Sequence, residues 1–323
     1  SKPHAAHIPI FWQRGGIPVA LFVLLASVYM LVYSGRIESG DSAVLFNAVT
    51  SFYRFGDFQL DLMMSERLPA TFNPNAPLLV SASAEPLQVV LAQPLYALAH
   101  AIPGLGLVHT VWVFNVIVSA LAGCVIYAYA LHLGYARRTA VVGALAFGLG
   151  TMIVPYSKSF FREPLTLLMV LLVGLTADQT RRSGYRPLWI AALAVMTGLM
   201  LLTRAPALFA LPGLAVIVLP GVRRIDRRAA ITLALLAGVI AAFLIITNLV
   251  GDSFFGGRYD ILRRLGGQNP YLITALHSYL LSVGGSIWAS SPVTLLALPG
   301  IGLLARAGQP SYACAAVIIL LAF

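Results

Sequence analysis

Charged side chains are scarce in this sequence. Asp, Glu, Lys and Arg make up 10% of its 323 residues and hydrophobic residues 59%, whereas about a quarter of an ordinary soluble domain is charged. Its two cysteines, Cys124 and Cys314, both lie in apolar stretches, so there is no disulfide framework or thiolate metal site to argue from. The six histidines are too scattered to suggest metal-ligand spacing. The composition predicts an integral membrane protein, and no metal site can be inferred.

Apolar stretches recur along the chain and predict an all-α polytopic membrane protein with about nine transmembrane helices. Eight stretches approach spanning length, and a ninth near the end, 313–323, is shorter. Because this last stretch is too short for a spanning helix, we expect the chain to lack a C-terminal part. The eight are 17–33, 109–131, 139–156, 164–176, 188–203, 205–220, 229–250 and 292–304.

The arginines predict the orientation of these spans. Lys and Arg collect on the cytoplasmic side of membrane proteins, which places a tail at 1–16 and the pairs and clusters at 137–138, 181–186 and 223–228 inside. Residue 35 then lies outside and residue 137 inside, so an odd number of crossings lies between them and the lengths allow one. We assign it to 109–131, so 87–102, broken by Pro94, lies at the outer interface or re-enters from it. Twelve basic and two acidic residues lie inside and nine of each outside; no basic excess is left for nucleic acid.

Two outer segments, 35–86 and 251–291, are longer than simple connectors. Within the first, 41–58 carries apolar residues at helical spacing and predicts an amphipathic helix on the membrane surface. The second contains an aromatic, glycine-rich stretch, 271–288, typical of a hairpin in the interface. The domain organisation is thus a tail at 1–16 and a transmembrane domain at 17–323, with these outer segments inside it.

Ionisable residues cluster where the predicted spans reach the outer face. Glu38 and Asp41 follow the first span, and the stretch YSKSFFREPL at 156–165 carries Lys158, Arg162 and Glu163. Arg204 stands alone at a third outer junction. A carboxylate can accept a proton from an attacking hydroxyl, and Arg or Lys can hold a phosphate. These residues fit an enzyme that acts on an anionic, membrane-anchored substrate.

Each acid also has a structural interpretation. Glu163 precedes Pro164, and this pair is a good helix start with a negative charge at the positive end of the helix dipole. Asp41 could cap the helix predicted at 41–58. These alternatives stay open from the sequence.

Four short stretches, in this order, resemble the polytopic glycosyltransferases of the GT-C superfamily, which use polyprenyl-phosphate-linked sugars. The similarity is to the protein O-mannosyltransferases and the lipid A aminoarabinose transferases, and it runs from about residue 17 to 304. The stretches are SGDSAVLF at 39–46, continued by RFGDFQL at 54–60; EPLQVVLAQPLYAL at 85–98; YSKSFFREPL at 156–165; and LSVGGSIWASSP at 281–292.

The resemblance implies a GT-C-like bundle and a role for each outer charge. Asp41 would be the catalytic base of an inverting transfer and Glu163 a second acid near the site. The implied substrate-binding residues, among them the phosphate contacts, are Glu38, Glu85, Lys158, Arg162 and Arg204. Two family cations are missing, because Glu85 stands where His or Lys is common and Ser286 stands near the place of an Arg.

The expected partners are the lipid-linked sugar, the bilayer, an acceptor that the sequence does not identify, and other membrane proteins. No cofactor is implied with certainty, and a divalent ion is left open. The expected location is the inner or plasma membrane, with the active site on the extracytoplasmic face. Two other classes compete: a non-catalytic scaffold subunit, favoured by the missing cations, and a transporter. Charges at the outer surface, not at mid-bilayer, argue against the transporter.

Overall fold

A computed structural model describes residues 16–58, 86–219, 226–249 and 286–322, with a few positions between 274 and 282. The tail at 1–15, the rest of the first outer segment with Glu85, and most of 251–291 with its hairpin lie outside the described residues. Every regular element within the described ranges is a helix. For this part of the chain the predicted all-α fold is confirmed.

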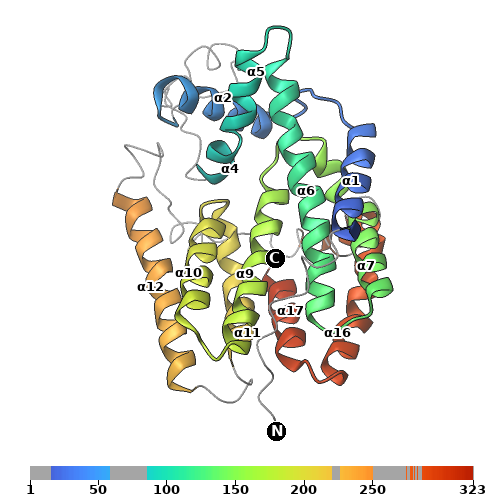
Figure 1. Ribbon diagram of the computed structural model, residues 1–323, viewed down its shortest axis with the longest axis vertical. Coiled ribbons are helices and arrows are strands. Elements are labelled where there is room, and N and C mark those ends of the chain that lie inside the picture. The colour runs from blue at the N-terminus through green and yellow to red at the C-terminus, as the bar shows by residue number, and fades with distance from the viewer. Residues whose placement is uncertain are drawn as a thin grey trace.

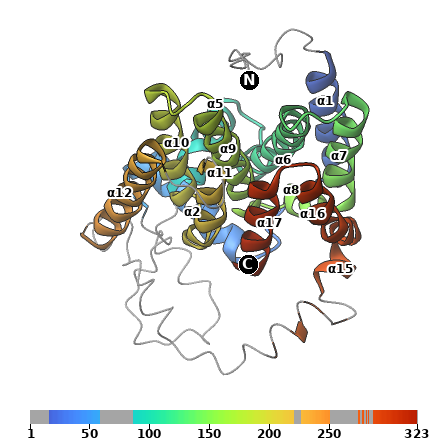
Figure 2. The same ribbon diagram turned by 90° about the horizontal axis from the view of Figure 1, so that it is seen from below.

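The helices form an up-and-down bundle around α6 (Leu107–His132) and α9 (Glu163–Arg182), which pack against each other. α1 (Gly16–Leu31) and α7 (Arg137–Gly150) lie on the far side of α6. Beyond α9 lie α10 (Pro187–Leu201), α11 (Leu211–Val218) and, at the edge, α12 (Arg227–Leu249). α17 (Pro310–Ala322) returns beside α11, and α16 (Ala297–Arg306) packs against α17, as Figure 2 shows.

Three predicted spans are each divided into two shorter helices. The stretch 139–156 becomes α7 and α8 (Ile153–Ser157), because Thr151 between them is extended. The stretch 205–220 becomes the 3₁₀ helix η2 (Ala205–Ala210) and then α11, each with a proline in its first turn. The stretch 292–304 becomes the 3₁₀ helix η3 (Pro292–Leu296) and α16.

By length and composition, two helices of the described residues could cross a membrane: α6, and Arg227–Ile246 within α12. The other apolar helices are shorter or less apolar than that criterion requires. The nine-span arrangement therefore stays a prediction.

Three helices gather at one end of the bundle, here called the α2 end: α2 (Gly40–Phe55), α4 (Pro86–Leu91) and α5 (Gln93–Ala101) (Figure 1). α2 is the helix predicted at 41–58, and it buries its apolar side through Leu45, Ala48 and Val49. The stretch 87–102 forms two short helices, neither of them long enough to span a bilayer. At the opposite end, the arginine end, α6, α9 and α16 finish, and α7 and α12 begin.

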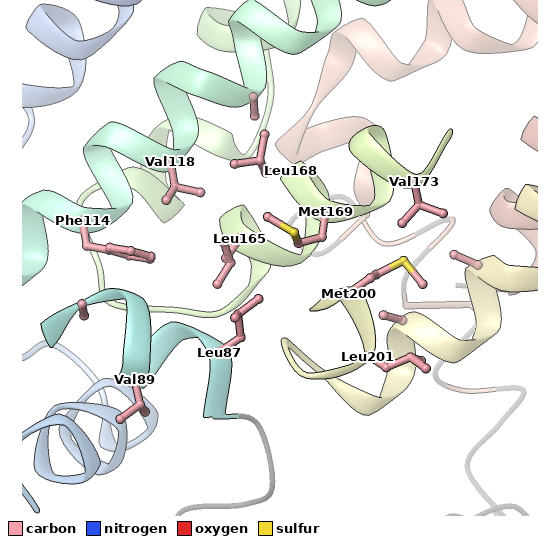
Figure 3. Close-up of a cluster of buried hydrophobic side chains, with 14 of the residues drawn as sticks. Leu87, Val89, Phe114, Val118, Leu165, Leu168, Met169, Val173, Met200 and Leu201 are labelled. Atoms are coloured by element: carbon pink, nitrogen blue, oxygen red, sulfur yellow. The ribbon is translucent and has the colours of Figure 1, made fainter. Parts of the chain in front are cut away.

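A buried hydrophobic cluster joins the α2 end to the bundle. Figure 3 shows α4 contributing Leu87 and Val89, and α6 contributing Phe114 and Val118. From the other side α9 and α10 add Leu165, Leu168, Met169, Val173, Met200 and Leu201. A backbone hydrogen bond of 3.1 Å from Leu87 N to Leu202 O fixes α4 directly to the end of α10. The segments that carry the predicted site are therefore held on one packed core.

Candidate functional site

The start of α2 leaves the carboxylate of Asp41 unused by the helix cap. Ser39 is the N-cap residue, and its Oγ accepts a hydrogen bond of 3.2 Å from Ser42 N. Asp41 lies in the first turn, where a negative charge is favoured by the helix dipole. Its side chain is exposed and makes no hydrogen bond or ion pair with another described residue. The capping alternative for Asp41 is therefore wrong, since Ser39 has that role.

The segment between α8 and α9 carries Lys158 and Arg162, leads into Glu163 at the start of α9, and is held by two buried amides. Asn115, fully buried on α6, donates from Nδ2 to Ser159 O at 2.6 Å and to Phe161 O at 2.8 Å. Gln88 on α4, also fully buried, donates from Nε2 to Phe160 O at 3.5 Å. Buried backbone carbonyls require partners of this kind. These amides fix the position of Lys158 and Glu163 relative to α4 and α6.

Aromatic packing completes this support. The ring of Phe160 stacks on Trp112 with centroids 5.1 Å apart, and both side chains are fully buried. Phe46 of α2 also contacts Trp112, with the two ring centroids 5.6 Å apart. Sequence reasoning did not select Asn115, Gln88 or Trp112. The available signal was a polar amide within an otherwise apolar helical stretch, since such a group must find a partner.

Two ion pairs connect the predicted residues. Lys158 Nζ lies 3.5 Å from Glu38 Oε2, so the segment before α9 is linked to the chain entering α2. Arg204 Nη1 donates to Glu163 Oε1 at 2.5 Å, which links the start of η2 to the start of α9. All four side chains are about one-third to two-fifths exposed. Exposed pairs of this kind contribute about 0–1 kcal/mol each, so an incoming anion could replace the carboxylates at low cost.

Glu163 has a second carboxylate oxygen in a different environment. Oε2 is buried and has no hydrogen-bond partner among the described residues. A buried carboxylate oxygen is costly to leave unpaired. Glu163 also occupies the first turn of α9, as its structural interpretation predicted. The same residue thus begins the helix, pairs with Arg204 through Oε1 and leaves Oε2 without a partner among the described residues.

Arg162 occupies the N-cap position of α9, and its carbonyl accepts 3.0 Å hydrogen bonds from Thr166 N and Thr166 Oγ1.

No contact joins Asp41 to Glu163 within the described residues, although both helices begin at the α2 end. A cavity shared by these two acids therefore stays a prediction. Glu85 falls outside the described residues. Nowhere in the described ranges do three or more His, Cys, Asp or Glu side chains form a group that could hold a metal ion.

A second charged cluster, which sequence reasoning treated only as an orientation signal, lies at the arginine end. Asp178 near the end of α9 is fully buried and contacts Arg181, Arg182 and His132. Burial by itself raises the pKa of Asp178, but the hydrogen bond from His132 and the two guanidinium groups outweigh it and lower the pKa to about 2. The Arg181 guanidinium also lies over the ring of Tyr312 on α17, 5.8 Å from its centroid.

The position of this cluster separates it from the predicted site. It joins the ends of α6 and α9 to the start of α17, where Gln309 Nε2 also donates to Leu133 O at 3.0 Å. His132, Arg181 and Arg182 each contact Asp178. The cluster therefore holds the ends of α6 and α9 against the start of α17.

Comparison with known proteins gives no independent assignment for this geometry. No protein-family model and no curated protein matches the chain.

Proposed function

We propose that the chain is a multispan membrane glycosyltransferase of the GT-C type, with its site at the α2 end facing the extracytoplasmic side. It would transfer a sugar from a polyprenyl-phosphate donor to an acceptor hydroxyl. The observation that carries the proposal is Asp41, an exposed carboxylate that does not cap α2 and has no ion pair with any described residue, at the same end as Lys158 and Arg204. In this proposal Asp41 is the base, and Lys158 and Arg204 at the same end are the cations that bind the phosphate.

The exposed apolar surface supports the membrane part of the proposal. The spanning window of α12 has a mean hydropathy of 2.8 and is 17% buried within the bundle. Leu31, Leu188 and Leu296 are 85%, 75% and 68% exposed. Soluble proteins rarely expose large contiguous apolar surfaces. A surrounding bilayer accounts for them, and the nine-span arrangement is part of this proposal.

In the proposed reaction Asp41 accepts the proton of the acceptor hydroxyl. The hydroxyl oxygen forms a bond to the anomeric carbon from the face opposite the phosphate, and the carbon–oxygen bond to the phosphate breaks. The electron pair of that bond leaves on the phosphate, where Lys158 and Arg204 stabilise the charge. Substrate binding thus requires these cations to leave Glu38 and Glu163, which the weak, exposed pairs allow. No step is routed through a metal ion.

The test is the variant Asp41→Asn, assayed in membranes for transfer of labelled sugar from a mixture of polyprenyl-phosphate sugars. We expect a fall of at least about 100-fold, because general-base catalysis contributes roughly 10²–10⁴-fold. Glu163→Gln should weaken transfer less, since it leaves the base intact. The matched control is Asp226→Asn, which exchanges one good N-cap for another at the arginine end. Full transfer by Asp41→Asn would contradict the proposal.

A scaffold subunit is the second candidate, and one observation favours it. Lys158 and Arg204 are both neutralised by carboxylates of the same chain, as expected of charges that only connect segments. If wild-type protein transfers no label from any donor, while Asp41→Asn and Glu163→Gln are as abundant as wild type, the scaffold interpretation takes its place.

A further inference from the structure

A cavity of about 340 Å³ lies between α9, α10, η2, α11 and α12. Its walls are almost entirely aliphatic and include Val173 of α9, Leu193 of α10, Leu214 of α11 and Ile240 of α12. Ligand cavities commonly measure roughly 300–1,000 Å³. Figure 2 shows that the helices forming it are neighbours at one side of the bundle, with α12 outermost.

Two properties of the cavity indicate an occupant. The cavity is partly open at the surface of the bundle, and an aliphatic space of this size does not hold ordered water well. Thr197 of α10 is the single polar side chain among the described residues that line it, and the remaining walls are aliphatic. An apolar chain therefore fits this space better than a polar ligand does.

The cavity extends toward the arginine end. Val218, one of its lining residues, accepts a 2.9 Å hydrogen bond at its carbonyl from Tyr185 Oη. The turn that contains Tyr185 is joined to α12, since Arg228 Nη1 donates to Gly184 O at 3.3 Å. The wall of the cavity is thus continuous with the turn between α9 and α10 and with the start of α12.

Basic side chains lie at the arginine end, on the turn before α10 and at the start of α12. Arg186, Arg227 and Arg228 are all exposed there. One exposed acid, Asp226, opposes them, and its Oδ1 accepts a 2.7 Å hydrogen bond from Ala229 N. Asp178 is buried and paired with its own cations. The exposed charge is therefore positive, and arginines near a bilayer surface attract anionic lipid headgroups.

We propose that this cavity binds one acyl chain of an anionic phospholipid, whose headgroup is held by Arg227 and Arg228. The inference rests on the membrane placement in the proposed function and not on its catalysis. α12 supplies one wall, is otherwise little covered by the bundle, and would be held in place by the lipid. The headgroup would lie at the arginine end, opposite to Asp41, and the cavity extends from there as far as Leu208 of η2.

The test uses Ala237, which lines the cavity yet is exposed on α12, so a larger side chain there fills the cavity without overpacking the core. Protein in micelles containing equal amounts of phosphatidylglycerol and phosphatidylcholine is examined by native mass spectrometry. We expect wild type to retain one phosphatidylglycerol and Ala237→Phe to lose it. Ala242→Phe, exposed on a part of α12 that does not line the cavity, is the matched control and should retain it.

The headgroup is tested separately with the double variant Arg227→Gln/Arg228→Gln. We expect about a tenfold loss of retained phosphatidylglycerol. Arg137→Gln/Arg138→Gln, equally exposed at the start of α7, should show no loss. Equal retention by Ala237→Phe and Ala242→Phe, or equal retention of phosphatidylcholine by wild type, would overturn the proposal. Sugar transfer is measured on the same variants. Because Ala237→Phe should transfer sugar normally, failure of the lipid-site proposal can be told apart from failure of the glycosyltransferase proposal.

Discussion

The role of a charged residue in this chain depends on which residues contact it. Asp178 and Asp226 are the two acids that the sequence assigns to the arginine-rich side, yet the structure gives them different roles. Asp226 accepts a hydrogen bond from Ala229 N and caps α12 on the surface. Asp178 is buried among His132, Arg181 and Arg182. A buried acid without these cations would be strongly destabilising, so the four side chains must be considered together.

The variant Asp178→Asn should lower stability in a pH-dependent way. The pKa of Asp178 falls from 3.8 to about 2 on folding, so its carboxylate stabilises the fold above pH 4 and this contribution is lost as the pH falls toward 2. The shift corresponds to about 2 kcal/mol at pH 7. Denaturant unfolding in detergent should show wild type more stable than Asp178→Asn at pH 7, with the difference shrinking as the pH falls toward 2.

Asp226→Asn is the control for this measurement, because Asn replaces Asp as an N-cap within a few tenths of a kcal/mol. A difference between wild type and Asp178→Asn that stayed constant from pH 7 to pH 2 would contradict the assignment of the effect to the carboxylate charge.

At the scale of elements, close helix contacts depend on glycine at particular positions. Gly213 of α11 faces α17, where a Cβ would lie 2.8 Å from Ala315 O and 2.7 Å from Ile319 Cγ1. A backbone oxygen cannot move aside without shifting its helix. Gly238 of α12 has nothing within 4 Å of an added Cβ. Substituting each glycine by alanine therefore separates packing from helix propensity.

Gly213→Ala should reduce stability by about 1–3 kcal/mol, since the methyl group forces α11 and α17 apart. Gly238→Ala should be neutral or stabilise by up to about 1 kcal/mol, because Ala is the better helix former. Thermal unfolding of the two variants in the same detergent measures both effects. Equal destabilisation by the two variants would show that the α11–α17 contact is not the cause.

The elements that could be predicted from sequence are those encoded by a local pattern. The apolar stretch at 109–131 is long and unbroken, and α6 covers it. The helical spacing at 41–58 predicts α2 to within three residues. Pro206 and Pro212 divide 205–220 into two helices, a break that composition alone does not reveal.

The site was only partly predictable for the same reason. Its charged residues are visible in the sequence because charge is rare, but their pairing joins segments far apart. Glu163 meets Arg204 across 41 positions, and Asn115 reaches Ser159 across 44. No local pattern carries information about such contacts, since they arise from how α6, α9 and η2 pack. The Asp178 cluster was not predicted from the sequence, because its arginines were interpreted only as a signal for the orientation of the chain in the membrane.

For the whole molecule, the described residues form two chemically distinct ends separated by an apolar middle. The α2 end carries Asp41 with the Glu38–Lys158 and Glu163–Arg204 pairs, and the arginine end carries the buried Asp178 cluster. Many large apolar side chains are exposed on the described residues, as the proposed placement in a bilayer requires. Both proposals depend on the sidedness of the chain, that is, on which side of the membrane each end of the bundle faces.

Sidedness is testable with single cysteines and a membrane-impermeant maleimide. In a background of Cys124→Ser and Cys314→Ser, we expect Ile37→Cys and Leu105→Cys to be labelled from the same outer face, because both precede a helix at the α2 end and are exposed. Ala136→Cys, exposed at the arginine end, should be labelled only after the membrane is permeabilised. Labelling of Ile37→Cys and Leu105→Cys from opposite faces would mean that 87–102 crosses the bilayer. The helices after it would then be reversed, and Asp41 and Glu163 could not share a site.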